Sequence, residues 1–575
     1  MSRRLDELGL FDMSQTTTPE PARRPVLARH PRALAAGLLL PLAAFGLLGG
    51  CSKEPPRELA EKSALGLDLK RPDALIESVS LSRLPKDILA VPLLRDTLTE
   101  DFVFYYQDNA DRLGLSGSLR RIIYERDLKL QDTLLDELLD QPAEVALWRG
   151  ADGKLKHVLL TIERGGLARV LEPLAHVALD DSQLSQAGEL RVDGDSVPLY
   201  RLSYLGDRSV LLASHGDKLL VLSSPGMLMD EAGQLAKDAT ESVESLLDGE
   251  NPFPERFGLD ARGTEQQRIA LGGEYVAFGY QRFFPSFAGL RFEMDDKGWH
   301  SYVALNDVDD QPAFDFAPIW KAMPMGASAC VALPVAPGVP GKLLDRVGAG
   351  KEVAAELEKR LNGAAGLCWY AESRLHSPLL VTQLGEKVTP ELDTAIEGLF
   401  GSVIGAYEPY VEGGRFPVDD QTQGETRRWT RDVGSNFGQY SASENANPDA
   451  LGSSGFFRVS LARHGDTLLF SLDDKLVTKG LDTLDKRFPP LAETLPKDAL
   501  VPAFMAPDGL SKLLERETLD SLPSNYEPVF RNAAETHLLP KLRALGGHGK
   551  YALALPEGTK TGSDWQWLPL EWRPL

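Results

Sequence analysis

Apolar and polar residues alternate along much of the chain in short runs that end at Gly-Asp or Asp-Gly pairs, a pattern that predicts antiparallel β-hairpins. The clearest hairpin covers residues 143–163, with Asp152-Gly153 at its turn. One pattern occurs twice, at residues 214–239 and 463–488: a His-Gly-Asp turn, an apolar strand and then a helix. In the first copy the helix is expected over residues 227–239. The repetition predicts two copies of one structural unit.

The order of elements around this pattern defines two modules, at residues 76–310 and 318–575. The first module is expected to open with a strand from Ile88 to Leu93. The hairpin, an amphipathic helix at residues 165–178, three strands, a helix after Pro225 and a final strand, helix and hairpin follow. The second module shows the same order. We therefore predict an α+β fold of two tandem, internally duplicated modules, each a mainly antiparallel sheet with helices packed on one face.

The modules differ most in the connection that leads into the His-Gly-Asp turn. Tyr200 lies 15 positions before His215, whereas Trp429 lies 35 positions before His464. The additional residues, at 435–455, are rich in Ser, Asn and Gly, which predicts an inserted surface loop. Such a loop is either a binding device or a tolerated insertion.

The N-terminal fifty residues have the pattern of a secretory signal. A cluster of arginines precedes an uncharged apolar run at residues 33–48, which is too short for a comfortable transmembrane helix. The run ends in Leu48-Gly49-Gly50-Cys51, which resembles a bacterial lipobox. We expect residues 1–50 to be a signal peptide, Cys51 to carry lipid and residues 51–75 to form a charged tether. The alternative is an ordinary signal peptide or membrane anchor with an incidental cysteine.

These features predict a chain that is lipid-anchored in the cell envelope and faces the periplasm. Synthesis starts at either Met1 or Met13. Ser52 differs from the aspartate that commonly signals inner-membrane retention, so we favour the outer membrane. The chain holds 84 acidic and 62 basic residues, a net charge of −22. Because such a polyanion repels phosphate backbones, we expect no nucleic-acid partner.

Cys330 and Cys368 are the only cysteines besides Cys51. Both lie in predicted strands of the second module, and an oxidising compartment favours their bridging. Counting along the repeat puts their counterparts near Val91 and Ala146, which are small and apolar, so both cysteines are expected to face the core. The pair is either a disulfide or two buried free thiols that behave as small hydrophobic side chains.

The chain lacks the local sequence motifs of serine hydrolases, zinc proteases, nucleotide-binding loops and Cys-x-x-Cys redox sites. His215 beside Asp217, and His464 beside Asp466, form either a metal or acid–base pair or an ordinary turn, and we favour the turn. Paired acids, mostly at predicted turns or helix starts, are Asp180-Asp181, Asp295-Asp296, Asp309-Asp310, Asp419-Asp420 and Asp473-Asp474. We expect no catalytic residues, no cofactor and no metal site.

Aromatic residues gather at the end of the first module and at the C-terminus. The first group lies within residues 275–292, and the second is Trp565, Trp567 and Trp572. We expect both groups to fill cores, because aromatic side chains bury a large apolar area. The alternative is an exposed patch for a partner protein or the lipid interface.

Residues 81–108, 143–150 and 276–285, together with the lipobox, resemble the YfaA-like family of bacterial envelope proteins, a domain of unknown function. The resemblance covers nearly the whole mature chain. It implies an envelope location and suggests a partner, because genes of this family often neighbour the gene of a bacterial alpha-2-macroglobulin-like protease trap. The family offers no catalytic residues to assign to this sequence.

The sequence therefore favours a non-catalytic envelope lipoprotein that binds or scaffolds another envelope protein. Two alternatives stay open: a periplasmic hydrolase with a scattered active site, and a carrier of a small apolar ligand between sheet and helices. A polar cleft with converging His, Asp or Ser would indicate the hydrolase. An apolar cavity would indicate the carrier.

Overall fold

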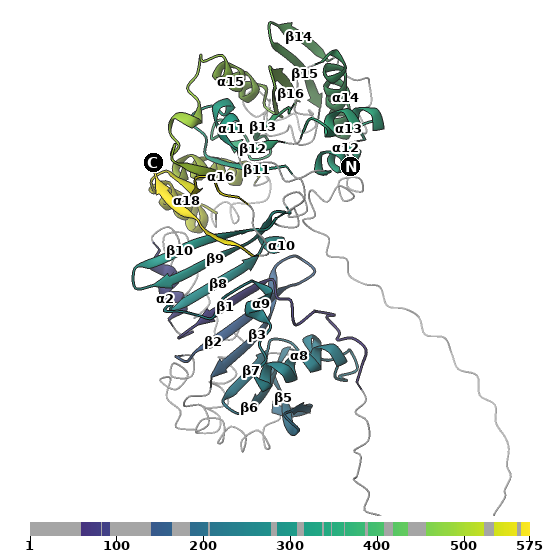
Figure 1. Ribbon diagram of the computed structural model, residues 1–575, viewed down its shortest axis with the longest axis vertical. Coiled ribbons are helices and arrows are strands. Elements are labelled where there is room, and N and C mark those ends of the chain that lie inside the picture. The colour runs from purple at the N-terminus through teal and green to yellow at the C-terminus, as the bar shows by residue number, and fades with distance from the viewer. Residues whose placement is uncertain are drawn as a thin grey trace, which may run out of the picture. The chain divides into compact units, whose positions relative to one another are not determined.

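The computed structural model describes most of the chain from Leu59 onward. The described residues are 59–81, 83–91, 140–163, 184–204, 208–277, 285–307, 315–335, 338–346, 348–361, 363–385, 389–407, 418–434, 456–521, 534–560 and 565–575. The expected signal peptide, Cys51 and the expected loop at 435–455 lie outside them. Residues Leu59–Leu575 form one compact unit that contains two antiparallel sheets (Figure 1).

The first sheet is built from the first module and one strand near the C-terminus, and all its neighbouring strands are antiparallel. Its strands are β1 (Ala74–Ser78), β2 (Ala143–Arg149), β3 (Leu155–Glu163), β4 (Leu184–Val192), β5 (Asp195–Tyr204), β6 (Arg208–His215), β7 (Lys218–Leu222), β8 (Gln267–Gly272), β9 (Phe287–Asp295), β10 (Gly298–Leu305) and β20 (Trp567–Pro569). Its described helices are α2 (Leu84–Leu89), the 3₁₀ turn η2 (Pro225–Met227), α8 (Lys237–Asp248), α9 (Phe253–Arg256) and α10 (Gly273–Val276).

The second sheet is antiparallel throughout and belongs to the second module. Its strands are β11 (Ala329–Pro334), β12 (Ala364–Trp369), β13 (Leu379–Gln383), β14 (Asp419–Gln423), β15 (Thr426–Gly434), β16 (Phe456–His464), β17 (Thr467–Ser471), β18 (Ala499–Met505), β19 (Tyr551–Pro556) and β21 (Glu571–Pro574). Its described helices are α11 (Ala317–Ala322), α12 (Val339–Arg346), α13 (Lys351–Glu358), α14 (Pro390–Tyr407), α15 (Asp474–Leu484), η6 (Leu491–Glu493), α16 (Pro507–Ser521), η7 (Ala534–Leu538) and α18 (Leu539–Gly546).

The two sheets have the same strand order. The first reads β4-β5-β6-β7-β3-β2-β1-β8-β9-β10, and the second reads β14-β15-β16-β17-β13-β12-β11-β18-β19-β21. Each strand therefore occupies the position of the strand that has the same rank in the other module. The exception is β20, which extends the first sheet beyond β10 and has no counterpart among the described strands of the second.

Equivalent backbone hydrogen bonds fix the register between the modules. Asp73 N–H donates to Leu147 O over 2.8 Å, and Ser328 N–H donates to Trp369 O over 2.7 Å. On the other side of the central strand, the carbonyl groups of Asp73 and Ser328 each accept a bond of 2.8 Å, from the residue that ends β8 or follows β18. Ser328 therefore corresponds to Asp73, and the central strands β1 and β11 correspond residue by residue.

The structure corrects the expected start of the first module. The opening strand is β1, whereas the segment expected to form a strand from Ile88 to Leu93 begins with helix α2. Residues 59–75, expected to be a tether, belong to the fold. Leu69 is 2% exposed, and Ala60 N–H donates to Leu235 O over 2.7 Å. The helix expected over residues 227–239 forms ten residues later, as α8.

The main core of the first module lies on one face of its sheet, whereas α2 lies on the other face, where Asp87 accepts from Gln267 Nε2 over 2.8 Å. Val243 and Leu246 of α8 and Phe253 of α9 pack in the main core against the buried side chains of the central strands. Aliphatic residues at helical spacing give α8 one apolar side, and Gly249, at φ 107°, ends the helix in the left-handed region. The core therefore lies between the sheet and these helices.

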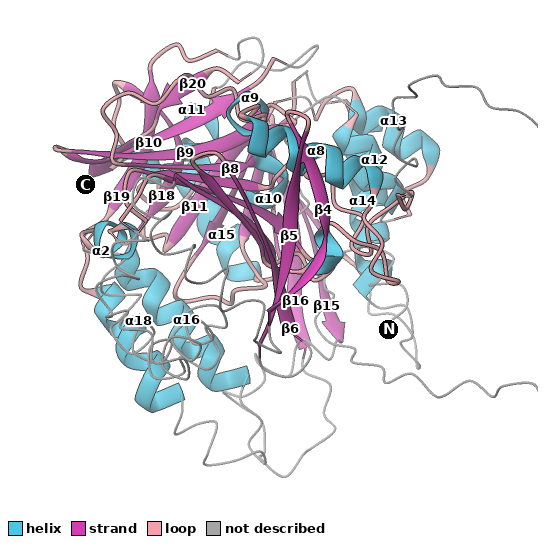
Figure 2. Cartoon of the chain, turned by 90° about the horizontal axis from the view of Figure 1, so that it is seen from below, coloured by secondary structure: helices cyan, strands magenta, loops and turns pink. Residues whose placement is uncertain are grey.

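The second sheet carries helices on both faces, rather than the single face expected. Neighbouring strand residues point to opposite faces. Leu469 belongs to the core formed with α11 and α15, whereas Leu468 belongs to the core formed with α12, α13 and α14. Figure 2 shows α12, α13 and α14 as one group and α16 beside α18 as another.

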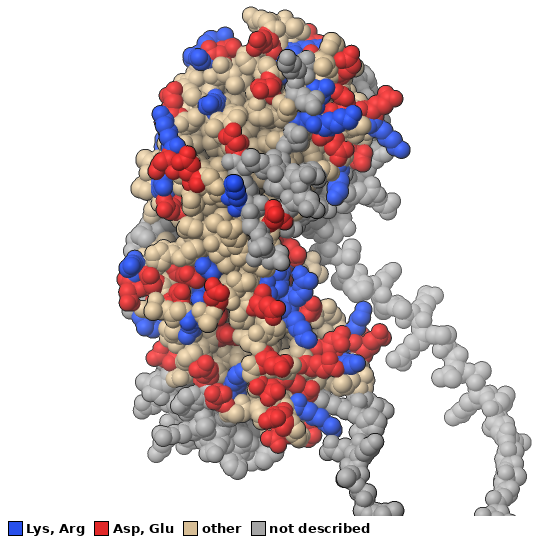
Figure 3. Space-filling model, in the orientation of Figure 1, with Lys and Arg blue, Asp and Glu red and all other residues tan. Residues whose placement is uncertain are grey.

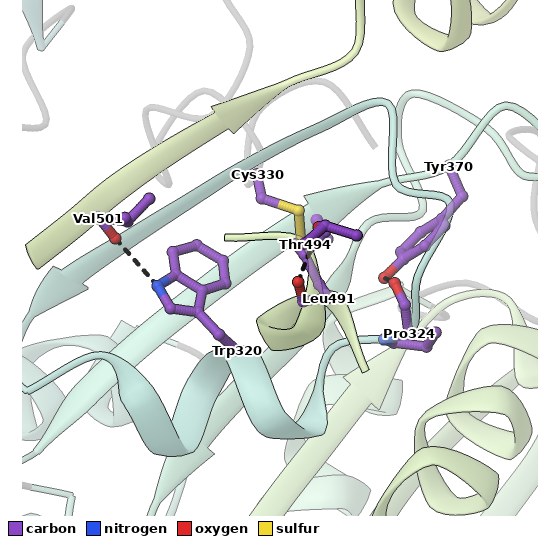
Figure 4. Close-up of a disulfide and its surroundings, with 8 residues drawn as sticks. Trp320, Pro324, Cys330, Tyr370, Leu491, Thr494 and Val501 are labelled. Carbon is purple, nitrogen blue, oxygen red and sulfur yellow. Dashed lines mark hydrogen bonds between the residues drawn. A yellow bond between two sulfur atoms is a disulfide. The ribbon is translucent and has the colours of Figure 1, made fainter. Parts of the chain in front are cut away.

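A disulfide joins Cys330 of β11 to Cys368 of β12 (Figure 4). The two residues are direct cross-strand partners with Cα atoms 4.2 Å apart, and both are buried. The register places Leu75 and Ala146 at the equivalent positions, so the expected counterpart Val91 was wrong and Ala146 was right. Beside the disulfide, the hydroxyl of Tyr370 donates to Pro324 O over 2.9 Å. The disulfide fastens the central strand of the second module to its neighbour.

Replacing Cys330 and Cys368 with alanine should lower the free energy of unfolding of the second module by about 3–4 kcal/mol in the chain-entropy model. The reason is that the bond joins residues 38 positions apart. In hydrogen exchange, amides of β11 and β12 should lose protection. Thiol labelling of the denatured, unreduced protein that finds both cysteines free would contradict the disulfide.

Candidate functional site

The two His-Gly-Asp turns close equivalent hairpins. Gly216 lies at φ 55° and Gly465 at φ 56°. A positive φ at the first of the two turn residues is typical of the type II′ hairpin turn, in which glycine is favoured. The turn geometry therefore depends on glycine, and the neighbouring histidines are not needed to form it.

The surroundings of the second turn are occupied by structural contacts. His464 Nδ1 lies 2.8 Å from the hydroxyl of Thr426, its cross-strand partner. Arg463 binds Asp393 of α14 through both carboxylate oxygens, at 2.6 and 3.1 Å, and donates to the carbonyl oxygens of Glu425 and Gly465. These bonds fasten α14 to the hairpin, as a buried guanidinium requires.

The described paired acids serve turns, helix caps and ion pairs. Asp473 caps α15 by accepting from Lys475 N–H at 3.0 Å. Its neighbour Asp474 pairs with Arg428 of β15. Asp295 accepts from Lys297 N–H at 2.7 Å in the β9–β10 turn. Asp420 pairs with Arg427 of the neighbouring strand β15, and Asp419 pairs with Arg458 of β16. Asp180-Asp181 and Asp309-Asp310 lie outside the described residues.

A row of charged side chains crosses four strands of the first sheet, and our sequence analysis missed it; three of the four are buried and Glu144 is partly buried. Glu144 (β2), Glu77 (β1), Arg268 (β8) and Glu293 (β9) are successive cross-strand partners, and we call them the charge row. Arg268 Nη1 lies 3.0 Å from Glu77, and its Nε lies 3.2 Å from Glu293. Arg268 is 3% exposed, and Glu77 and Glu293 are each 7% exposed.

The charge row lies on the same face as the apolar core of the first module. Glu77 and Arg268 are each two residues from a core side chain of the same strand, and alternate strand residues share a face. The segment before β8 lies against the row, because Arg268 Nη1 donates to Asp260 O over 3.0 Å and Glu265 lies 3.6 Å from Arg268. The row is therefore enclosed between the sheet and this segment.

Glu144 lies at one end of the row, where fewer positive charges offset the cost of burying its carboxylate. Burial raises the pKa of Glu144, and the carboxylate of Glu77 raises it further. A hydrogen bond from Asn251 Nδ2, 2.6 Å long, and the charges of Lys218 and Arg262 oppose that increase in pKa. Glu144 therefore takes up a proton at a higher pH than an exposed glutamate does.

Arg291 extends the row towards the edge of the sheet. Its Nε lies 3.2 Å from Glu293, and its guanidinium carbon lies 4.4 Å from the ring centre of Tyr302 and 4.9 Å from that of Trp567. Burial lowers the pKa of Arg291 and raises the pKa of Tyr302. Stacking on two aromatic faces stabilises the partly desolvated cation.

The equivalent position in the second module is apolar. The register makes Ala332 the equivalent of Glu77, and Gly366 the equivalent of Glu144. Ile319 of α11 packs directly against Gly366, in space that a larger side chain would fill. The charge row is therefore a feature of the first module, and its ion pairs join β8 to β1 and to β9.

The surface of the described residues is strongly acidic. Figure 3 shows acidic side chains gathered where Figure 1 shows α8, whose sequence contains Asp238, Glu241, Glu244 and Asp248. Within the described ranges, no three His, Cys, Asp or Glu side chains are grouped so that they could hold a metal ion. None of the described helices is both long enough and apolar enough to span a membrane.

Comparisons with known proteins place the chain among bacterial relatives. A family model described as "Uncharacterized protein conserved in bacteria (DUF2138)" matches residues 31–572. A curated relative, "Uncharacterized protein YfaA" of Escherichia coli strain K12, is 47% identical over 519 residues, which are 89% of this chain and 91% of that protein.

Two solved structures show only weak similarity. Crystal form IV of TP0453 matches 43% of this chain and 81% of its own, with a TM-score of 0.22 and 9% identity. Crystal form III of the same protein matches 72% of this chain and 97% of its own, with a TM-score of 0.19 and 8% identity. Scores this low carry no argument about fold or function.

The double change His215→Ala, His464→Ala should alter the free energy of unfolding by no more than about 1 kcal/mol, because glycine forms each turn. Urea denaturation measures it. The matched control, Gly216→Ala with Gly465→Ala, should cost about 1–2 kcal/mol for each residue, because alanine is strained at these φ values. A large loss of stability, or the loss of a bound metal, in the folded histidine variant would show that the imidazoles have a further role.

The change Glu144→Gln should stabilise the protein at neutral pH and make its stability less dependent on pH. The folded-state pKa of Glu144 lies above the ordinary 4.5, so the folded state holds the proton more strongly than the unfolded state does. Ionisation of Glu144 therefore lowers the free energy of unfolding. This loss of stability grows as the pH rises from 4.5 through the raised pKa, and it is constant at higher pH.

Urea denaturation between pH 4 and pH 8 tests this sign, with Glu77→Gln as the matched control. That control should destabilise the protein, because Arg268 loses a buried carboxylate partner. A Glu144→Gln variant that is less stable than the unaltered protein at neutral pH would refute the assignment.

Proposed function

Because the chain belongs to the DUF2138 family of uncharacterised bacterial proteins, we propose a role in the bacterial cell envelope. The protein is a lipoprotein anchored through acylated Cys51 and facing the periplasm, with the outer membrane favoured by Ser52. It acts as a non-catalytic binding or scaffold protein for another envelope protein.

Two independent features support export, and the first of them also supports anchoring. The first is the order of basic segment, apolar run and lipobox that ends at Cys51. The second is the disulfide between Cys330 and Cys368, because disulfides persist in oxidising compartments such as the periplasm and are rare in the cytosol.

One observation supports the binding role most directly: the side chains that could have formed a catalytic or metal site make contacts that stabilise the fold. Asp473 caps a helix, Asp295 fixes a turn, and His464 hydrogen-bonds to its cross-strand partner. The buried carboxylates of the charge row pair with guanidinium groups of the same sheet. These side chains hold the fold together instead of converging on a substrate, which favours a binding protein over a hydrolase.

Two partners follow from this proposal. The bilayer binds the lipid on Cys51, and an envelope protein binds the folded modules. The family resemblance suggests an alpha-2-macroglobulin-like protein as the first partner to examine. The acidic surface favours a partner with a basic contact surface, because complementary charge steers association.

The two modules are proposed to derive from the duplication of one ancestral module. The shared strand order and the equivalent backbone bonds of Asp73 and Ser328 support this origin. So do two aromatic residues that lie two positions after Ala146 and Cys368: Trp148 donates to Asp68 O, and Tyr370 donates to Pro324 O. An experimental structure in which the two sheets had different strand orders would contradict the duplication.

Mass spectrometry of the membrane fraction tests the anchor. The mature chain should begin at Cys51 and carry a diacylglycerol group on its sulfur, whereas Cys51→Ser should remain an unprocessed precursor. The matched control, Cys330→Ser with Cys368→Ser, removes the other two cysteines and should leave the lipid in place. An unmodified Cys51 within a longer, soluble chain would overturn the proposal.

A further inference from the structure

The last residues of the chain take part in both sheets. After β19 the chain leaves the second sheet, and β20 pairs with residues Tyr302–Ala304 of β10 in the first. The chain then returns, and β21 pairs with residues Tyr551–Ala554 of β19 in the second. We call residues 565–575 the C-terminal clasp.

The first half of the clasp is held by the first module through specific contacts. Trp565 N–H donates to Asn306 Oδ1 over 2.7 Å, and Trp567 Nε1 donates to Phe257 O over 3.1 Å. The Trp565 ring packs edge-on against Phe257, with ring centres 5.9 Å apart. Gly258 lies directly under Trp565, where a Cβ atom would collide with it. The module therefore holds a fitted place for Trp565.

The clasp also covers the outer end of the charge row. Trp567 lies over the Arg291 guanidinium, with 4.9 Å between the guanidinium carbon and the ring centre, and Tyr302 stacks on the same group. Arg291 in turn contacts Glu293. A residue close to the C-terminus thus completes the enclosure of a buried cation in the first module.

The second half of the clasp closes an apolar junction between the modules. Val303 and Leu305 of β10 form one buried cluster with Leu555 of β19 and with Leu570, which lies between the two clasp strands. Leu570 N–H donates to Ser301 O over 2.8 Å. Trp572 Nε1, from β21, donates to the hydroxyl of the same serine over 3.0 Å.

We infer that the C-terminal clasp couples the two modules, so that they unfold and respond as one body. Without the clasp, β10 would lose its neighbour β20, and β19 would lose β21. The apolar side chains on both sides of the junction would then be partly exposed to solvent. An edge strand gains stability from each neighbour that pairs with it. The coupling does not depend on lipid at Cys51. Through it, a partner that binds one module also affects the stability of the other.

The test uses the full mature chain and the double change Trp565→Ala, Trp567→Ala. Hydrogen exchange should show a loss of protection in β10, while β1 and β8 stay protected and report that the first module is folded. Reduction of the Cys330–Cys368 disulfide adds a second readout, because the bond lies only in the second module. In the unaltered protein, reduction should lower the melting temperature of both modules together. In the clasp variant it should lower that of the second module alone.

Trp369→Ala is the matched control, since Trp369 lies in the second module and donates to Leu375 O within that module. This control should keep the modules coupled. Asn306→Ala, which removes only the acceptor for Trp565 N–H, replaces the double variant if that variant leaves β1 and β8 unprotected. Modules that unfold independently in the unaltered protein, or that stay coupled in the clasp variant, would overturn the inference.

Discussion

Each module is organised around its first strand, which lies in the middle of the sheet. β1 pairs with β2 on one side and with β8 on the other, so Ile76 has Val145 and Ile269 as its cross-strand partners. In the second module, β11 lies in the same way between β12 and β18. Because these partners are distant in sequence, the chain must close long loops before the central strand is paired on both sides. The other strands of each sheet lie on either side of this triplet.

The two modules reinforce this triplet by different chemistry at neighbouring positions. The second module uses the disulfide between Cys330 and Cys368, which constrains the unfolded chain. The first module has Leu75 and Ala146 at the equivalent positions, and Glu77, two residues further along β1, pairs with Arg268. Buried ion pairs favour a defined register more than they add stability, because removing charges from water is costly. The C-terminal clasp connects these two reinforced sheets.

The parts of the fold that could be predicted from the sequence depend on local signals. The α+β class, the two modules, the hairpin turns and the helix α15 follow from turn residues and short-range periodicity, and the family resemblance is confirmed. The segment at Ile88 was misassigned because a short apolar run fits either a strand or a helix. The charge row was missed because Glu77 and Arg268 occupy positions that the strand pattern reserves for apolar side chains. The strand β20 was assigned to the wrong sheet because its partner is distant in sequence.

The central claim is that this chain presents a folded surface to another envelope protein. Photo-crosslinking in intact cells tests it directly, with the crosslinker placed in turn at exposed apolar residues of the second module: Leu343, Leu375 and Leu538, which are 45%, 44% and 41% exposed. A buried position, Leu513, serves as the control. The account predicts that at least one exposed position yields a discrete adduct with another envelope protein and that Leu513 yields none. Folded, lipidated protein that forms no protein adduct from any exposed position would contradict it.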